Sequence, residues 1–104
     1  MSLTYEKLTR KPLVFLRITG MTVKEFEVLS EKVHPLWNKL LKSKKLEGRP
    51  TKLRTMRDHL LALLMYYRTY ITYDFLGYLF GLSTSNIWYA VNRVQPLVLK
   101  VVAI

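Results

Sequence analysis

The chain has 104 residues, half of them hydrophobic, which suits one domain with a single core and excludes a disordered chain. Seventeen lysines and arginines oppose seven acidic residues, and the resulting net charge of +10 favours a polyanionic partner: DNA, RNA or an anionic membrane surface. The absence of cysteine excludes disulfide scaffolds, thiolate zinc sites and cysteine nucleophiles, and it fits a reducing cytoplasm.

The first third of the chain predicts helices, because apolar residues recur at spacings of three and four. One helical stretch covers about residues 4–18, and Pro12 divides it into two short pieces. Gly20 ends it as a helix C-terminal glycine does. Residues 1–11 are polar and do not have the apolar core of a signal peptide, so we expect a soluble intracellular protein.

A capping box opens the next predicted helix. The Thr22 hydroxyl can accept a hydrogen bond from the backbone N–H of Glu25, and the Glu25 side chain can in turn accept one from the backbone N–H of Thr22. Apolar residues from position 23 to position 33 fall on one stripe of this helix. We expect Pro35 to end it or to begin another short helix with its own apolar stripe at residues 36–41.

A basic loop is predicted over residues 42–54 because of its Gly48-Arg49-Pro50 turn signal. Eight cations lie in or beside it, opposed by Glu47; they are Lys39, Lys42, Lys44, Lys45, Arg49, Lys52, Arg54 and Arg57. Such a cluster is expected to bind phosphates and release counterions. The tripeptide also resembles the core of an AT-hook, which inserts into the minor groove, although a solvated turn is an equally good interpretation.

Three further segments follow the loop. Thr55 begins a helix over about residues 56–70 that is apolar nearly all round and should therefore be the central, most buried helix. Its longest apolar run, residues 60–67, is too short to span a bilayer. Thr72 and Ser83 are N-cap candidates for the next two helices, and Gln95-Pro96 is expected to separate the last of them from an apolar segment at residues 97–104. The prediction is an all-α compact bundle of five or six helices.

Residues 72–94 match a helix-turn-helix. Gly81 can adopt the positive φ that the tight turn needs, and Gly77 allows the two helices to cross closely. Leu82 should plug the space between the helices. Three aliphatic side chains should pack the second helix against the core; they are Ile87, Val91 and Val94.

With that aliphatic face buried, the 100° step of the helix fixes the face that points outward. The central outward residues are Ser85, Tyr89 and Asn92, and the flanking ones are Trp88, Asn86 and Arg93. Such donors, acceptors and flat rings can reach base edges and phosphates in a major groove, and we expect no acid on this face. An ordinary helical hairpin, with Trp88 and Tyr89 as packing residues, is the alternative.

The predicted DNA-contacting residues form two sets. The base-reading set is Ser83, Thr84, Ser85, Asn86, Trp88, Tyr89, Asn92 and Arg93. The phosphate-binding set is Lys42, Lys44, Lys45, Arg49, Lys52, Arg54 and Arg57. The tyrosines at positions 66, 67, 70, 73 and 78 could stack bases of a single strand, but their helical spacing favours packing in the core and between helices.

No catalytic constellation is apparent in the sequence. His34 and His59, the two histidines, lie in different predicted helices, and each is expected to be a surface or packing residue. Asp58 and Asp74 are better explained as first-turn acids at helix starts. We therefore expect no catalytic residue, metal site or cofactor.

Several motifs, taken in order, resemble the N-terminal region of bacterial insertion-sequence transposases with a DDE-type catalytic domain. They are Ile18-Thr19-Gly20-Met21-Thr22, Phe26, Gly48-Arg49-Pro50, Tyr70-Ile71-Thr72-Tyr73-Asp74-Phe75-Leu76-Gly77 and Phe80-Gly81-Leu82-Ser83. The resemblance runs from about residue 15 to residue 97. It implies binding to the terminal inverted repeats of a mobile element, and a catalytic domain with metal-binding acids that follows this region.

The sequence thus predicts a single helical DNA-binding domain over residues 1–104, non-catalytic by itself, that recognises duplex DNA sequence-specifically. The expected partners are double-stranded DNA, a downstream catalytic domain and a second copy in a homodimer, with no membrane partner. The expected location is the bacterial cytoplasm, with the protein on the nucleoid when bound. Two alternatives stay open: a helical protein–protein interaction or dimerisation module using residues 97–104, and a small helix-turn-helix transcriptional regulator.

Overall fold

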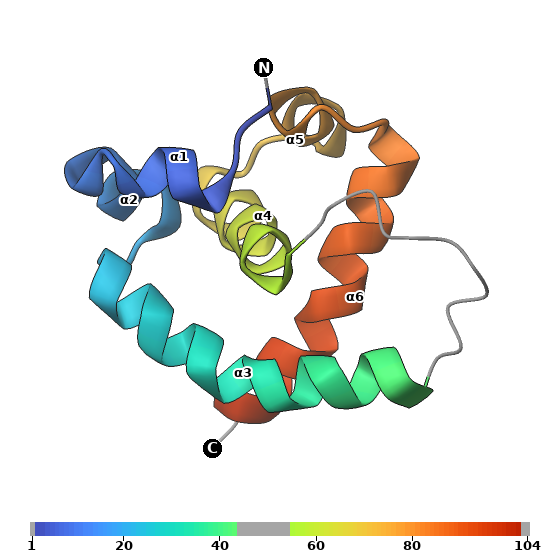
Figure 1. Cartoon of the computed structure of the whole chain (residues 1–104). Helices are drawn as coiled ribbons and strands as arrows, with labels where there is room; N and C mark the ends of the chain where they lie inside the picture. The colour runs from blue at the N-terminus through green and yellow to red at the C-terminus, as the bar shows by residue number, and fades with distance from the viewer. Residues whose placement is uncertain (1, 44–54, 103–104) are drawn as a thin grey trace.

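The computed structural model describes residues 2–43 and 55–102, and these residues form six α-helices and no strand (Figure 1). The helices are α1 (Tyr5–Thr9), α2 (Pro12–Thr19), α3 (Val23–Ser43), α4 (Met56–Thr69), α5 (Tyr73–Phe80) and α6 (Thr84–Val102). The prediction of an all-α bundle of five or six helices is confirmed. No helix within the described ranges has the length and apolar character that a membrane crossing requires.

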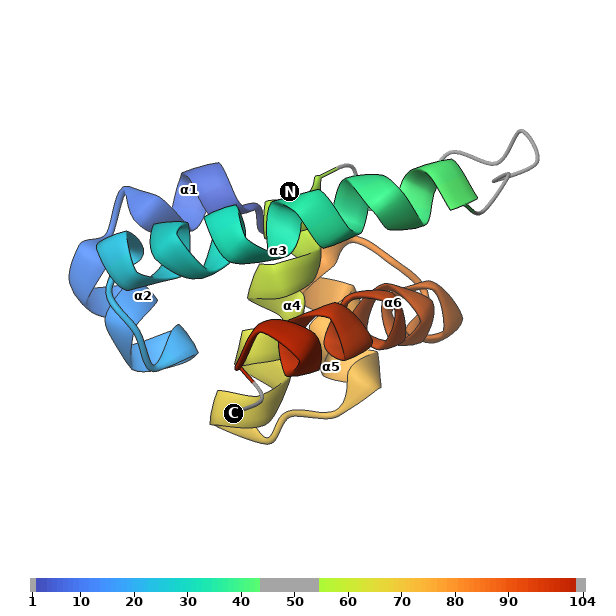
Figure 2. The same ribbon diagram turned by 90° about the horizontal axis from the view of Figure 1, so that it is seen from below.

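Helix α4 lies at the centre of the bundle, with the other helices arranged around it (Figures 1 and 2). Four consecutive residues, from Leu60 to Leu63, are completely buried, so every side of the helix touches protein over this turn. The near-continuous apolar run predicted this position, which is confirmed. Burial of one leucine side chain contributes about 1.5–3 kcal/mol, so the buried leucines of α4 contribute substantially to the stability of the core.

The N-terminal helices are joined by an aromatic cluster. The rings of Tyr5 in α1 and Phe26 in α3 stack with their centroids 4.8 Å apart, and Phe15 of α2 meets both rings edge-on. Thr4 caps α1, and Gly20, at a φ of 82°, ends α2. The division of this stretch at Pro12 and its end at Gly20 are therefore confirmed.

Two prolines that were expected to interrupt helices lie inside them instead. Helix α3 continues through Pro35, and α6 continues through Pro96 to Val102, so the predicted breaks at these positions are wrong. Both prolines are exposed, so water can solvate the carbonyl that each leaves without an intrahelical donor. Figure 1 shows α3 and α6 bending along their length, the usual effect of an internal proline.

Candidate nucleic-acid interface

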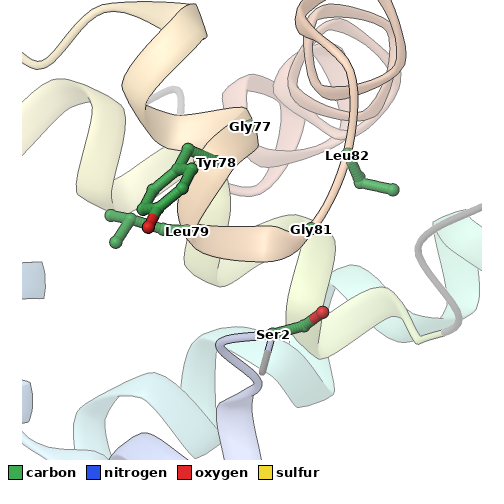
Figure 3. Close-up of a pocket in the computed structure, with 6 residues that line it drawn as sticks. All are labelled: Ser2, Gly77, Tyr78, Leu79, Gly81 and Leu82. Atoms are coloured by element: carbon green, nitrogen blue, oxygen red, sulfur yellow. The ribbon is translucent and has the colours of Figure 1, made fainter.

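The turn between α5 and α6 has the geometry that its two glycines predicted. Gly81 has a φ of 71° and ends α5, and the backbone N–H of Leu82 donates to the carbonyl of Gly77 at 2.8 Å. A Cβ added at Gly77 would lie 2.7 Å from the Leu82 carbonyl oxygen, closer than any real Cβ can approach. Figure 3 shows these residues with Ser2 of the N-terminal segment against the turn. Helices α5 and α6 and the tight turn between them give the helix, turn and helix that the sequence predicted, while the bounds of a motif at residues 72–94 stay a prediction because α6 continues to Val102.

Helix α6 is fixed through one face. The Oγ of Ser83 accepts a hydrogen bond from the backbone N–H of Asn86 at 3.2 Å and so caps the helix. Ile87, Val91 and Val94 are buried in the core, as the sequence predicted. With this face immobilised, the opposite face is held at a fixed angle to the rest of the domain.

The outward face of the first half of α6 presents Ser85, Trp88 and Tyr89 to solvent. Tyr89 is 59% exposed and Trp88 is 45% exposed, and their rings meet edge-to-face with centroids 5.2 Å apart. The helical-hairpin alternative requires both rings to pack in the core, and neither does. Asn92 is half-buried, and its side-chain amide donates to the Trp88 carbonyl at 2.8 Å.

Arg93 does not project freely from this face. It is half-buried, and its guanidinium lies 3.2 Å from Nε2 of His59. The Nδ1 of His59 lies 2.8 Å from the Thr55 carbonyl, and because a carbonyl can only accept, Nδ1 carries the proton and Nε2 accepts from Arg93. Arg93 thus connects α6 to the start of α4, and its assignment as a DNA contact stays a prediction.

An acid lies at the start of α6, contrary to expectation. The Thr84 hydroxyl donates a hydrogen bond to Oδ1 of Asp74, which is exposed in the first turn of α5. The outward face of α6 was expected to be free of acids, and this is true only of the side chains that α6 itself contributes. Asp74 lies in α5, ten residues before Thr84, so helical periodicity within α6 could not bring the two together.

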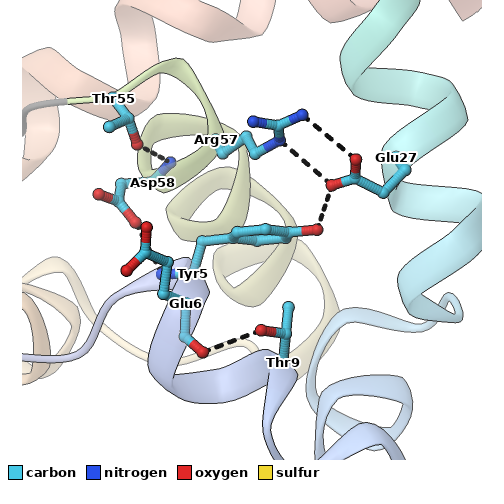
Figure 4. A network of polar contacts seen from close by, with 7 residues as sticks. All are labelled: Tyr5, Glu6, Thr9, Glu27, Thr55, Arg57 and Asp58. Carbon is cyan, nitrogen blue, oxygen red and sulfur yellow. Dashed lines mark hydrogen bonds and ion pairs between the residues drawn. The ribbon is translucent and has the colours of Figure 1, made fainter.

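The basic set divides between described and undescribed residues. Lys39 and Lys42 are exposed on the last turns of α3. Arg57 is exposed in the first turn of α4, where its guanidinium forms a double contact with the Glu27 carboxylate, at 3.2 Å for both pairs of atoms (Figure 4). The Tyr5 hydroxyl donates to the same carboxylate. The remaining predicted phosphate contacts, together with the Gly48-Arg49-Pro50 tripeptide, lie outside the described residues; they are Lys44, Lys45, Arg49, Lys52 and Arg54.

A comparison with protein families identifies what this arrangement is. The model of the helix-turn-helix of DDE superfamily endonucleases matches residues 51–102, which is half of the chain. The chain belongs to this family. Membership implies DNA binding, since the helix-turn-helix is the non-catalytic, DNA-binding part of a DDE endonuclease. No curated protein and no solved structure matches the chain.

The matched region contains α4, α5 and α6, the three helices that form and support the turn. The resemblance to transposases read from the sequence is thereby confirmed for its second half. The motifs before residue 51, including Gly20 and Phe26, lie outside the match, so their family assignment stays a prediction.

The domain also contains a tyrosine cluster whose connection to α6 the sequence did not reveal. Tyr66 and Tyr73 stack with centroids 4.4 Å apart. Burial raises the pKa of the Tyr73 hydroxyl, which shares hydrogen bonds with Tyr66 and Asn92. The prediction of helix-interface packing is confirmed for these two tyrosines, but it is wrong for Tyr70 and Tyr78, which are 89% and 77% exposed.

The two histidines play separate roles. His34 is exposed on α3 and lies within hydrogen-bond distance of Asn38, whereas His59 is fully buried beside Trp37, with ring centroids 4.7 Å apart. The prediction that they are surface or packing residues is confirmed. Over residues 2–43 and 55–102, no three His, Asp or Glu side chains cluster in a way that could hold a metal ion.

Proposed function

We propose that this domain binds duplex DNA sequence-specifically, with the first half of α6 in the major groove. The observation that carries the proposal is the two-faced character of that helix. Its aliphatic face is buried in the core, while Ser85, Trp88 and Tyr89 are exposed on the other side. A helix held in this way can present side chains to base edges without moving, so little ordering cost accompanies binding.

Phosphate contacts are assigned to the basic residues at the end of α3 and to those that follow it before α4. Lys39 and Lys42 are exposed cations at the end of α3, and the remaining candidates are the predicted phosphate contacts that lie outside the described residues. If about five phosphates are neutralised, log K should fall with log salt at a slope near −4.5. The Lys44→Ala variant should weaken binding to every duplex alike, because a phosphate contact has no base preference.

The target we propose is the terminal inverted repeat of the mobile element. Its support is membership of the family of helix-turn-helix domains of DDE superfamily endonucleases, together with the resemblance of the sequence to the N-terminal region of insertion-sequence transposases. In this proposal, the present domain positions the DNA, and a downstream catalytic domain supplies the metal-binding acids. The domain itself would then cleave no DNA.

Selection of bound duplexes from a random library tests this function. The purified chain should enrich a common sequence motif, and duplexes with the motif should bind far more tightly than random duplexes at physiological salt. Failure to retain any duplex at low salt would contradict DNA binding. Retention without enrichment would contradict sequence specificity while leaving DNA binding intact.

Self-association is a second candidate function, favoured by the end of α6. Leu99 and Val102 are both about half exposed there, and they lie three residues apart on one side of the helix. Light scattering with and without duplex DNA separates the two functions. A stable dimer that is indifferent to DNA would favour the interaction module over the DNA-binding domain.

A further inference from the structure

Asp74 occupies an unusual place for a carboxylate in a basic domain. It is the only acidic residue after Asp58 in the sequence, and it is exposed. The Thr84 hydroxyl donates to its Oδ1, which holds the carboxylate at the first residue of α6. Among the described residues, Asp74 forms no ion pair, and its Oδ2 has no hydrogen-bond partner. One oxygen is thus fixed and the other is free to face a ligand.

The position of this carboxylate places it next to DNA if the proposed function is correct. Ser85, the next residue after Thr84, is exposed on the outward face of α6. A recognition helix contacts base edges chiefly through its N-terminal residues. A group hydrogen-bonded to the first residue of that helix would therefore lie at the groove.

The chemistry of the major groove limits what such a group can bind. A carboxylate only accepts hydrogen bonds, and the donors presented there are the amino groups of cytosine N4 and adenine N6. Adenine presents its N7 acceptor beside N6, which repels a second carboxylate oxygen, whereas cytosine presents only its amino donor. Cytosine is the base that a fixed carboxylate suits best.

We propose that Asp74, oriented by Thr84, accepts a hydrogen bond from a cytosine amino group and specifies one C·G base pair of the target. The inference rests on the proposed function and adds a specificity-determining residue that lies on α5 and not on the recognition helix. The hydrogen bond from Thr84 to Oδ1 leaves Oδ2 of Asp74 for the base, so Asp74 and Thr84 together recognise the base pair. The alternative role for Asp74 is a structural tie between α5 and α6 with no effect on base preference.

Selection from a random duplex library, repeated with Asp74→Asn, separates these roles. The amide keeps an acceptor for Thr84 but adds donors, and an amide pairs best with adenine. We expect the variant to lose a roughly tenfold preference for cytosine at one position and to prefer adenine there, with the rest of the motif unchanged. The matched control is Glu31→Gln, which removes the same charge from the exposed side of α3, across the molecule from the turn (Figure 1). It should select the wild-type motif.

An unchanged motif with Asp74→Asn would overturn the inference. A uniform gain in affinity would then identify Asp74 as a repelling charge, and a uniform loss would identify it as a structural tie. If Asp74→Asn does not fold by circular dichroism, Thr84→Val carries the test: the preference for cytosine should weaken because Oδ1 is no longer held, and a fully retained preference would contradict the proposal. Failure of the wild-type chain to enrich any motif is a separate result, which would refute the proposed function itself.

Discussion

Arg93 of α6 donates a hydrogen bond to Nε2 of His59 in α4, across 3.2 Å and between two residues 34 apart in the sequence. His59 is completely buried, and its other ring nitrogen donates to the Thr55 carbonyl at the start of α4. This chain of contacts ties the orientation of α6 to the central helix α4. Both nitrogens of a buried imidazole are thereby satisfied, which a buried polar group requires.

Replacement of Arg93 by alanine should destabilise the domain. The variant leaves Nε2 of His59 buried without a donor, which costs about 1–3 kcal/mol. Urea unfolding at pH 7 measures the change, and Arg93→Lys, which keeps a donor and the charge, should recover part of the loss. Unchanged stability of Arg93→Ala would show that the contact with His59 contributes nothing to the fold.

Stability should fall as the pH is lowered from 7 to 5. Burial lowers the pKa of His59 from 6.5 to about 4, so over that range the unfolded chain binds more protons than the folded domain. The contribution is complete above pH 6.5 and is lost as the pH falls toward 4, which amounts to about 2 kcal/mol between pH 7 and pH 5. Urea unfolding at both values measures it.

The control for this pH dependence is His59→Gln, which cannot titrate and should show a much flatter profile. The hydrogen bond from the Thr22 backbone N–H lowers the pKa of Glu25, but this contribution is present in the wild-type domain and in His59→Gln alike, so it cancels in the comparison. Equal stability of the wild-type domain at the two pH values would contradict the buried neutral state of His59.

Gly77→Ala should destabilise the turn, although alanine in a helix is ordinarily favoured over glycine by about 1 kcal/mol. The new methyl group would lie 2.7 Å from the Leu82 carbonyl oxygen, which is backbone and cannot rotate away. We expect a net loss of about 1–3 kcal/mol in thermal or urea unfolding, together with weaker binding of duplex DNA. A more stable variant would mean that α5 and α6 cross less closely than described.

Lys42 and Arg57 should contribute differently to the salt dependence of binding. Lys42→Ala should reduce the slope of log K against log salt by about 0.9, the value for one phosphate contact. Arg57 already pairs with Glu27 through two contacts of 3.2 Å, so Arg57→Ala should reduce the slope by less. Fluorescence anisotropy with a labelled duplex between 50 and 200 mM salt, roughly the range over which such slopes are read, checks both. Equal reductions would show that Arg57 leaves Glu27 to bind phosphate.

Local signals in the sequence predicted most of the fold. The capping box is present, with Thr22 and Glu25 exchanging hydrogen bonds of 2.8 and 3.1 Å, and Gly20 and Gly81 both adopt positive φ. These features depend on residues a few positions apart, which a sequence displays directly. The predicted breaks at Pro35 and Pro96 are wrong because the cost of an internal proline depends on whether its site is exposed, and only the fold decides that.

The candidate site was predictable only as far as one helix determines it. The exposure of Ser85 and Tyr89 follows from helical periodicity once Ile87 and Val91 are placed in the core. The partners of Arg93 and Thr84 do not follow, because His59 and Asp74 come from other helices. Contacts of this kind depend on how helices cross, which periodicity within one helix does not contain.

The discrimination between the selected duplex and a random duplex tests most directly whether the outward face of α6 reads base pairs. The measurement is the ratio of the two dissociation constants for the wild-type chain and for Ser85→Ala/Tyr89→Ala, whose substitutions lie at exposed positions and should leave the fold intact. We predict that the double variant loses this discrimination by roughly tenfold or more, while its affinity for random DNA hardly changes. An unchanged ratio, or equal losses on both duplexes, would contradict the account.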